Sequence, residues 1–351
     1  MEEKNRKINV LPSPTYSWLR MNEAEIAAPA ELLEGKLELR GGTGYTIARC
    51  DYGELSDIAG GMGYDMDVLM RDSVSGVTKL TAEGSHEEAL RLSLQYHTGA
   101  RQADVLYVEL KDGASLSLVL DFQSDPGAEG FAAIQLKLRL GRNASLRLAQ
   151  IQRLSGPMTF LNDLGVKAGE EARFEQIQLS LSGENCYWGS RTDLVGRRSF
   201  LKTDIGYLLS GKNRLDMNYI ANHIGKKTEC EIVVDGVLRE EAFKLFRGTI
   251  DLRKGAKGAV GNELETVLLM DETVTNQTLP VILCDEDDVE GNHGASIGRL
   301  DEGLLFYLMS RGMDREAVYE MMARAKVDAV IQKIPDGETR ERLFRELHGS
   351  E

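Results

Sequence analysis

The feature of this sequence that most constrains its fold is a repeated unit of about thirty residues in the middle of the chain. In each copy a strand-like segment reaches a polar turn with a glycine, a small residue follows, and a segment of alternating apolar and polar residues resumes. The small residue is Ala114, Ala144 or Ala172, so the copies are about 30 and 28 residues apart. A period of roughly 20–50 residues is typical of units that stack into a solenoid.

The alternation continues through residues 228–236 and 245–252 and ends near residues 279–283. No amphipathic helix separates these strands, and this excludes the βαβ units of a Rossmann-type sheet. The 36 glycines against 7 prolines agree with a chain that turns often between short strands. A β-helix and a large β-sandwich remain as alternatives. The nearly constant spacing favours the β-helix, whose interior is filled by alternate apolar residues.

Composition and charge argue against several classes of protein. The formal net charge of -14 argues against a general binder of nucleic acid or anionic lipid, because both need a cationic face. The sequence contains no apolar run of the roughly 18–20 residues that a membrane-spanning helix needs, and its N-terminus does not resemble a signal peptide. The four cysteines are widely spaced, which argues against a disulfide framework or a structural zinc site. We therefore expect a cytoplasmic protein.

After Gly298 the pattern changes from strands to helices. Residues 301–312 predict a short helix with an acidic start and a glycine stop, and a second helix is expected to begin at Asp314. A third helix, over residues 338–348, is strongly charged and is expected to be peripheral. The expected organisation is a short N-terminal extension around Trp18 (residues 1–40), a β-helix core (41–298) and a helical C-terminal domain (299–351).

Four segments in fixed order carry a resemblance to a known family. They are residues 248–259, 277–280, 287–298 and 305–312, and the last two contain the patterns D-V-x-x-x-H-G-A-x-x-G and L-F-Y-L-x-S-R-G. This ordered set closely resembles the core of the SufB/SufD family, which belongs to the SUF machinery for iron–sulfur cluster assembly. The resemblance implies a right-handed parallel β-helix followed by a small helical domain. It also implies a scaffold subunit rather than an enzyme.

The resemblance further implies two partners. Members of the family pair through the C-terminal part of the β-helix and use their C-terminal helices to bind SufC, an ABC-type ATPase. ATP is then bound by the partner alone, and an iron–sulfur cluster is assembled transiently on the complex. The residues expected to contact the ATPase lie within 300–330 and include Leu305, Phe306, Tyr307, Arg311 and Gly312.

The histidine of the family motif falls on His293, which the resemblance places at the pairing surface. A neutral imidazole can bind iron, and the upstream carboxylates Asp288 and Glu290 offer hard oxygen ligands. Aligning the motifs puts Glu265 where SufB members carry a scaffold cysteine. The resemblance thus implies His293 and Glu265 as ligands of iron or of the cluster, and the chemistry of the nearby carboxylates adds Asp288 and Glu290 to the candidate ligands. The alternative is that His293 only forms hydrogen bonds at the interface.

Departures from the family pattern leave three interpretations open. The chain is a SufD-like partner that supplies His293 to a separate SufB, or a single paralogue whose homodimer uses Glu265 and His293. Less favoured is a role for Cys284 as a thiolate ligand, because strict alternation over nine residues would place it on the opposite face from His293. The other three cysteines are assigned to packing: Cys50, Cys186 and Cys230.

Two further sequence features and two alternative functions bear on this interpretation. His223 could line the same surface as His293, but a structural role is at least as well supported. The glycine-rich segment 60–63 lacks the Lys-Ser/Thr of a P-loop, so nucleotide chemistry is expected only in a partner. One alternative function is a structural partner of SufC that does not touch metal. The other, a β-helix enzyme acting on polysaccharides, would need a row of Asp and Arg at coil spacing, which is not evident.

Overall fold

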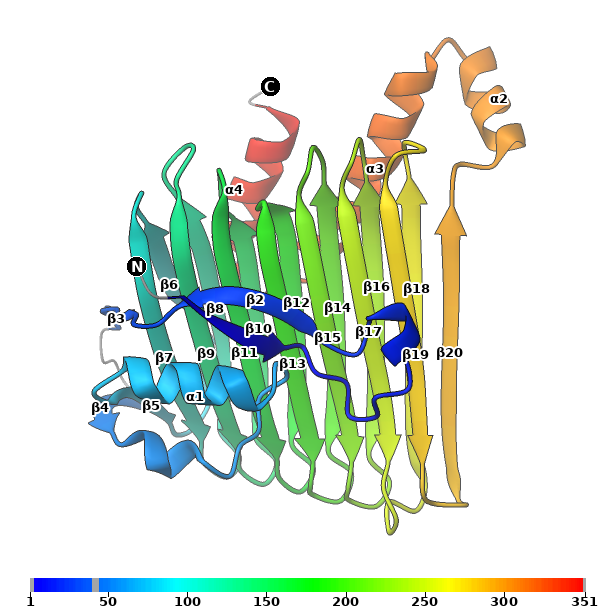
Figure 1. Ribbon diagram of the computed structural model, residues 1–351. Coiled ribbons are helices and arrows are strands. Elements are labelled where there is room, and N and C mark those ends of the chain that lie inside the picture. Colours follow the sequence, from blue (N-terminus) through cyan, green and yellow to red (C-terminus); the bar gives the residue numbers. More distant parts are fainter. Residues whose placement is uncertain (1–2, 40–43, 350–351) are drawn as a thin grey trace.

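The computed structural model describes residues 3–39 and 44–349, and its strands wind into a parallel β-solenoid of about 8 turns (Figure 1). Each full turn contributes one strand to each of two facing sheets. This confirms the β-helix and excludes the sandwich. The first sheet contains eight strands in the order of the chain: β6 (Leu90–Tyr96), β8 (Ser115–Ser124), β10 (Ser145–Arg153), β12 (Arg173–Ser182), β14 (Phe200–Leu209), β16 (Glu229–Leu238), β18 (Ala259–Leu269) and β20 (Val289–Gly298).

The second sheet faces the first across the interior. Its parallel strands are β5 (Val77–Ala82), β7 (Ala100–Leu110), β9 (Gly130–Leu140), β11 (Met158–Ala168), β13 (Asn185–Leu194), β15 (Arg214–His223), β17 (Phe243–Leu252) and β19 (Thr275–Cys284). At its first edge β4 (Tyr45–Cys50) pairs antiparallel with β5, and the short β3 (Leu33–Glu34) pairs with β7.

The repeated alanines hold the same place in successive turns of the solenoid. The amides of Ala114, Ala144 and Ala172 each donate to the carbonyl three residues earlier, and all three residues are 0% exposed. Ser199 and Thr228 hold the same position in the next two turns and are also 0% exposed, so this corner takes small side chains. The interior between the sheets forms one continuous hydrophobic cluster that runs from β5 to β18.

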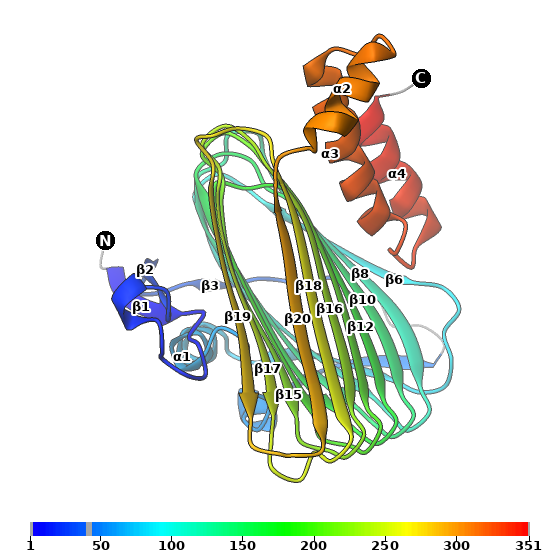
Figure 2. The ribbon, with the colours of Figure 1, turned by 90° about the vertical axis from the view of Figure 1, so that its right-hand side faces the viewer.

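The two outer faces of the solenoid are covered by the two ends of the chain (Figure 2). The second sheet is covered by the N-terminal elements β1 (Glu3–Ile8), η1 (Ser17–Leu19), β2 (Ala24–Pro29), η2 (Tyr52–Leu55) and α1 (Tyr64–Ser73). The first sheet is covered by α3 (Arg315–Ile331) and α4 (Gly337–His348), and α2 (Glu302–Ser310) lies beyond the strand ends against α3 (Figure 2). Among the described residues, no helix combines the length and the apolar character that a membrane span requires. The expected boundary at residues 40 and 41 lies outside the described residues.

The C-terminal helices begin where the sequence predicted. Asp301 caps α2 by accepting from the amide of Leu304, and Asp314 caps α3 by accepting from Ala317. The expectation of a peripheral third helix is wrong. Leu343 of α4 is 0% exposed in a cluster with the outer face of the first sheet, because the apolar residues of α4 share one stripe despite its many charges.

Candidate functional site

The last turn of the solenoid leaves its end open. Its two strands are β19 and β20, and within the described residues neither pairs with a strand on its outer side. Figure 2 looks onto this end and shows the two strands separated by the interior. Two parallel edges with unpaired backbone groups are a ready template for another chain.

His293 lies in the middle of β20 and faces the interior side of the last turn. The Cα register pairs it with Glu263 of β18. The same register position in the preceding turns is occupied by buried side chains: Ile232, Thr203, Gln176, Leu148 and Leu118. Because no further turn covers it, the imidazole is exposed, and it forms no hydrogen bond or ion pair with any described residue.

Glu263 is the neighbour of His293 that sequence reasoning missed. Its side chain is buried (6% exposed), yet it forms no hydrogen bond or ion pair in the described part of the chain. Burial, and secondarily the Glu265 carboxylate, raise the pKa of Glu263 to about 8. Across the interior, a Cβ on Gly248 of β17 would overlap the Glu263 carboxylate. The glycine therefore makes room for an acid that has no partner of its own.

Glu265, in contrast, is already satisfied. Its side chain and that of Lys244 are 1% and 0% exposed and form a direct ion pair. Thr278 of β19 donates to Glu265 Oε2 at 2.7 Å and accepts from Lys244 Nζ at 2.9 Å. Burial lowers the pKa of Lys244, and the two carboxylates oppose this shift. The Oδ1 atom of Asn276, next to Lys244 in register, is buried without a hydrogen bond among the described residues.

The other predicted ligands lie apart from His293 within one subunit. Asp288 is exposed in the turn before β20, where its carbonyl accepts from Gly258. Glu290 is exposed and, three residues before His293, lies on the opposite face of β20. Cys284 ends β19, so a turn separates it from His293, and the alternation argument made for this pair does not apply. In the described residues no three His, Cys, Asp or Glu side chains converge on one point.

His223 is part of the interior. It is 0% exposed, and its ring nitrogens contact Thr228 Oγ1 at 2.8 Å and Cys230 Sγ at 3.2 Å. Burial lowers the pKa of His223 to about 4, so the ring is neutral at physiological pH. The assignment of Cys186 and Cys230 to packing is confirmed, since both are 1% exposed and burial raises the pKa of each thiol to about 12.

Helix α2 presents an apolar surface next to this end of the solenoid. Leu305 is buried (7% exposed) in a cluster with β16, β18 and α3, so it anchors the helix. Phe306 and Tyr307 are 76% and 52% exposed, and the guanidinium of Arg311 lies over the Tyr307 ring at 5.3 Å from its centroid. Gly312 has φ +96°, which ends the helix in a conformation that favours glycine. Of the five predicted contact residues, Leu305 therefore anchors the helix, and Phe306 and Tyr307 are exposed. Arg311 and Gly312 lie beside this exposed pair at the end of the helix.

Comparison with known proteins places this architecture in a family. A family model described as "SUF system FeS cluster assembly, SufBD core domain" matches residues 94–326, well over half of the chain. The matched region begins within β6 and ends within α3. The open end and the helix α2 therefore lie inside the family core, whereas the N-terminal elements up to β5 lie outside it.

Three curated relatives illustrate the similarity. The iron–sulfur cluster assembly protein SufD of Bacillus subtilis is 29% identical over 196 residues, 56% of this chain and 45% of the relative. The protein ABCI7, chloroplastic, of Arabidopsis thaliana is 22% identical over 249 residues, 70% of this chain and 52% of the relative. The iron–sulfur cluster assembly protein SufB of Bacillus subtilis is 28% identical over 113 residues, 32% of this chain and 24% of the relative. The chain spans about half the length, or less, of these relatives.

Proposed function

This chain belongs to the SufB/SufD family of iron–sulfur cluster assembly proteins, and from that membership we propose that it is a non-catalytic assembly subunit that pairs with a second SufB/SufD-type subunit through the open end of its solenoid. The free edges of β19 and β20 support this proposal, because their backbone groups can be satisfied by the edge strands of a partner. The partner is a second copy of this chain or a paralogue.

The observation that carries the proposal is the pairing of His293 with Glu263 at this end. The imidazole is exposed on the interior side of the last turn, and the neighbouring carboxylate is buried without a partner. Nitrogen and oxygen donors suit Fe²⁺. In the assembled pair, His293 and Glu263 hold iron or a nascent cluster, which is the cargo of the complex, and the partner subunit supplies further ligands. Glu265, held by Lys244, positions the site rather than binding metal.

The C-terminal region, residues 299–351, serves as the docking site of a SufC-type ABC ATPase, which alone binds ATP. The exposed aromatic pair Phe306 and Tyr307 supplies the apolar contact, and Leu305 fixes the helix to the solenoid. We expect Phe306→Ser to abolish co-purification with the ATPase. Leu33→Ser is a matched control, because Leu33 is 74% exposed on β3, at the other end of the solenoid. Equal retention of the ATPase by both variants would contradict this docking site.

The ligand role is tested by anaerobic Fe²⁺ binding to the purified complex and by the visible absorbance of a reconstituted cluster. We expect His293→Ala and Glu263→Gln each to weaken Fe²⁺ binding by about tenfold or more. His97→Ala is the control, because that imidazole is 74% exposed and lies outside the motif. If the His293 variant bound iron and assembled clusters like the unmodified protein, the ligand role would be wrong, and the role as a structural partner of the ATPase would remain.

A further inference from the structure

The N-terminal loop, residues 11–22, is closed by hydrogen bonds and lies outside the family core. The amide of Leu11 donates to the carbonyl of Asn22 at 2.8 Å, which closes the loop. Inside it, the Asn22 side chain accepts from the amide of Tyr16 and donates to Ser17 Oγ, both at 2.8 Å. A loop with its own internal hydrogen bonds keeps its backbone in one compact conformation.

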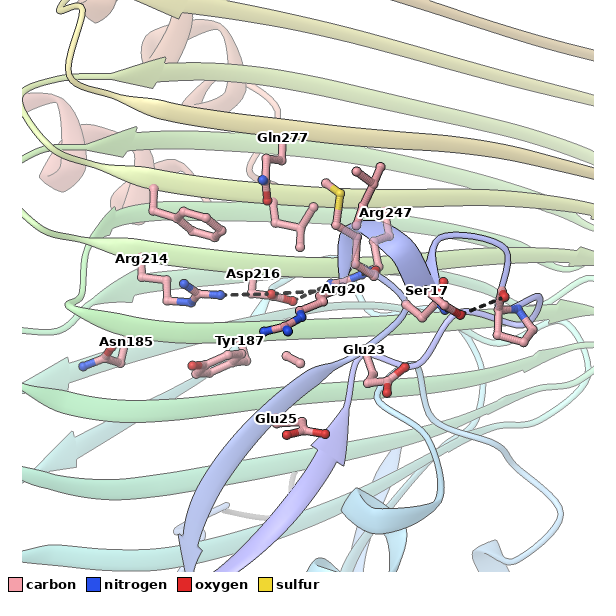
Figure 3. Close-up of a pocket in the computed structure, with 17 residues that line it drawn as sticks. Ser17, Arg20, Glu23, Glu25, Asn185, Tyr187, Arg214, Asp216, Arg247 and Gln277 are labelled. Carbon is pink, nitrogen blue, oxygen red and sulfur yellow. Dashed lines mark hydrogen bonds and ion pairs between the residues drawn. The ribbon is translucent and has the colours of Figure 1, made fainter.

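The loop is fastened to the last two strands of the second sheet. Met21 is buried with Leu245 of β17 and Leu279 of β19. The guanidinium of Arg247 donates to the carbonyl of Met21 at 2.6 Å and pairs with Asp216 at 2.6 Å, wholly out of solvent. Figure 3 shows these arginine contacts beneath the loop, at a cleft of about 1050 Å³ that the loop forms with strands β13 to β19. The loop therefore lies beside β19, whose outer edge is unpaired.

At the tip of this loop, two apolar side chains are presented to solvent. Trp18 is 94% exposed and Leu19 is 56% exposed, both on the short helix η1. Figure 1 shows η1 next to β17 and β19, at the same end of the solenoid as β20. A tryptophan exposed to water on a closed loop buries almost no apolar area within its own subunit, whereas buried tryptophans are enriched among the residues that dominate binding energy at interfaces.

We infer that the N-terminal loop is a second part of the subunit interface, in which Trp18 and Leu19 pack against a second copy of this chain docked on the open end. This inference rests on the pairing proposed above. A copy that pairs with the edges of β19 and β20 must pass close to the loop that borders β19. In a two-fold pair each loop meets the same region of the other subunit, so the contact is made twice. We assign a second copy of this chain to this surface because the loop lies next to the free edges of β19 and β20, with which that copy would pair.

The experiment uses the fact that the full chain has two tryptophans. Trp188 is 1% exposed and donates to Gln152 Oε1 at 2.8 Å inside the solenoid. In the Trp188→Phe variant, the fluorescence of Trp18 alone is followed with acrylamide as quencher over a dilution series. Light scattering on the same samples gives the fraction of dimer. The Trp18→Phe variant, which reports only Trp188, is the control for quencher access to the interior.

We expect Trp18 to be strongly quenched at low concentration and shielded over the range in which light scattering shows dimers. We also expect Trp18→Ser to weaken dimerisation by roughly thirtyfold, as for a tryptophan hot spot, and Leu33→Ser to leave it unchanged. Dimers in which Trp18 stays fully quenched would overturn the inference and leave the pairing intact. A Trp18 that is shielded already in the monomer would also overturn it. A chain that stays monomeric at high micromolar concentration would overturn both the inference and the pairing with a second copy.

Discussion

Replacing Lys244 by methionine should loosen the last turns of the solenoid, because the change leaves the Glu265 carboxylate buried without its cation. The two side chains are 0% and 1% exposed and in direct contact. Removing one partner of a buried ion pair costs about 3–5 kcal/mol. Lys244 also donates to Thr278 Oγ1 at 2.9 Å, and this bond is lost as well. We therefore expect the free energy of opening of this region to fall by about 4 kcal/mol.

The assay is amide hydrogen exchange of β17, β18 and β19, measured by mass spectrometry at pH 7. In a solenoid each turn contacts only its neighbours, so the last turns can open while the rest stays folded, and a global unfolding probe would miss the effect. The double variant Lys244→Met/Glu265→Leu should recover to within about 1–2 kcal/mol, since replacing a whole buried pair by apolar side chains is often neutral. Lys202→Met is the control. Lys202 pairs with Glu231 at 3.4 Å on the surface, and such a pair is worth less than about 1 kcal/mol.

The outcome decides between two roles for Glu265. If Lys244→Met changed the exchange of these strands no more than Lys202→Met does, Lys244 would not be what holds the Glu265 carboxylate, and Glu265 would be available as a metal ligand. If the double variant folds and still binds Fe²⁺, His293 and Glu263 suffice on this subunit. The same two measurements thus test the stability argument and the assignment of ligands.

Three further predictions follow from single residues. Burial holds the pKa of His223 near 4, so between pH 6.5 and 4 the unfolded chain binds a proton that the folded chain excludes; the free energy of unfolding should fall by up to about 3 kcal/mol over this range. A His223→Leu variant should lack that part of the urea-unfolding pH profile, and an unchanged profile would refute it. A thiol reagent should modify the exposed Cys284 rapidly, whereas Cys186 and Cys230 should react only on unfolding; fast labelling of either would contradict their burial. A Cβ at Gly61 would overlap the backbone of β13, so Gly61→Ala should destabilise the N-terminal elements by about 1–3 kcal/mol, measured by limited proteolysis, and equal protease resistance would refute the close contact.

The solenoid could be predicted from the sequence because its signal is repeated. Ala114, Ala144 and Ala172 occupy the same corner in successive turns, and the alternating segments between them line the same interior. Because the same pattern occurs several times, an irregularity in one copy does not change the prediction, and the predicted architecture does not depend on any single strand. The caps of α2 and α3 were predictable for a different reason, since Asp301 and Asp314 each satisfy a backbone amide within the first turn of their helix.

The candidate site was only partly predictable, because alternation gives the wrong face for β18. Read alone, the segment 262–265 puts Leu264 inside and the two glutamates outside. The structure reverses this, with Leu264 49% exposed and Glu263 and Glu265 buried. Register decides the matter, since these glutamates continue the interior positions of Ile232 and Val234 and a one-residue slip would turn every side chain of the strand over. An alignment of successive repeats, rather than hydrophobicity, would have found them, and it would also have placed His223 in the interior with Leu194 and Leu252.

The position of these charges along the solenoid is itself informative. Within one turn the interior changes from Leu215 to Lys244 and from Val234 to Glu265. In a central turn, a carboxylate without a partner such as Glu263 would be a permanent cost, because neither solvent nor a ligand could reach it. In the last turns the same cost is relieved when a metal ion or a second subunit covers the end.

Any ligand that binds the folded form of the last turns, and not the opened form, stabilises these turns by mass action. Hydrogen exchange of β18 and β20 should therefore slow when the complex is loaded with Fe²⁺, and the slowing should vanish in the Glu263→Gln variant. Equal slowing in both would mean that Glu263 does not face the bound ion.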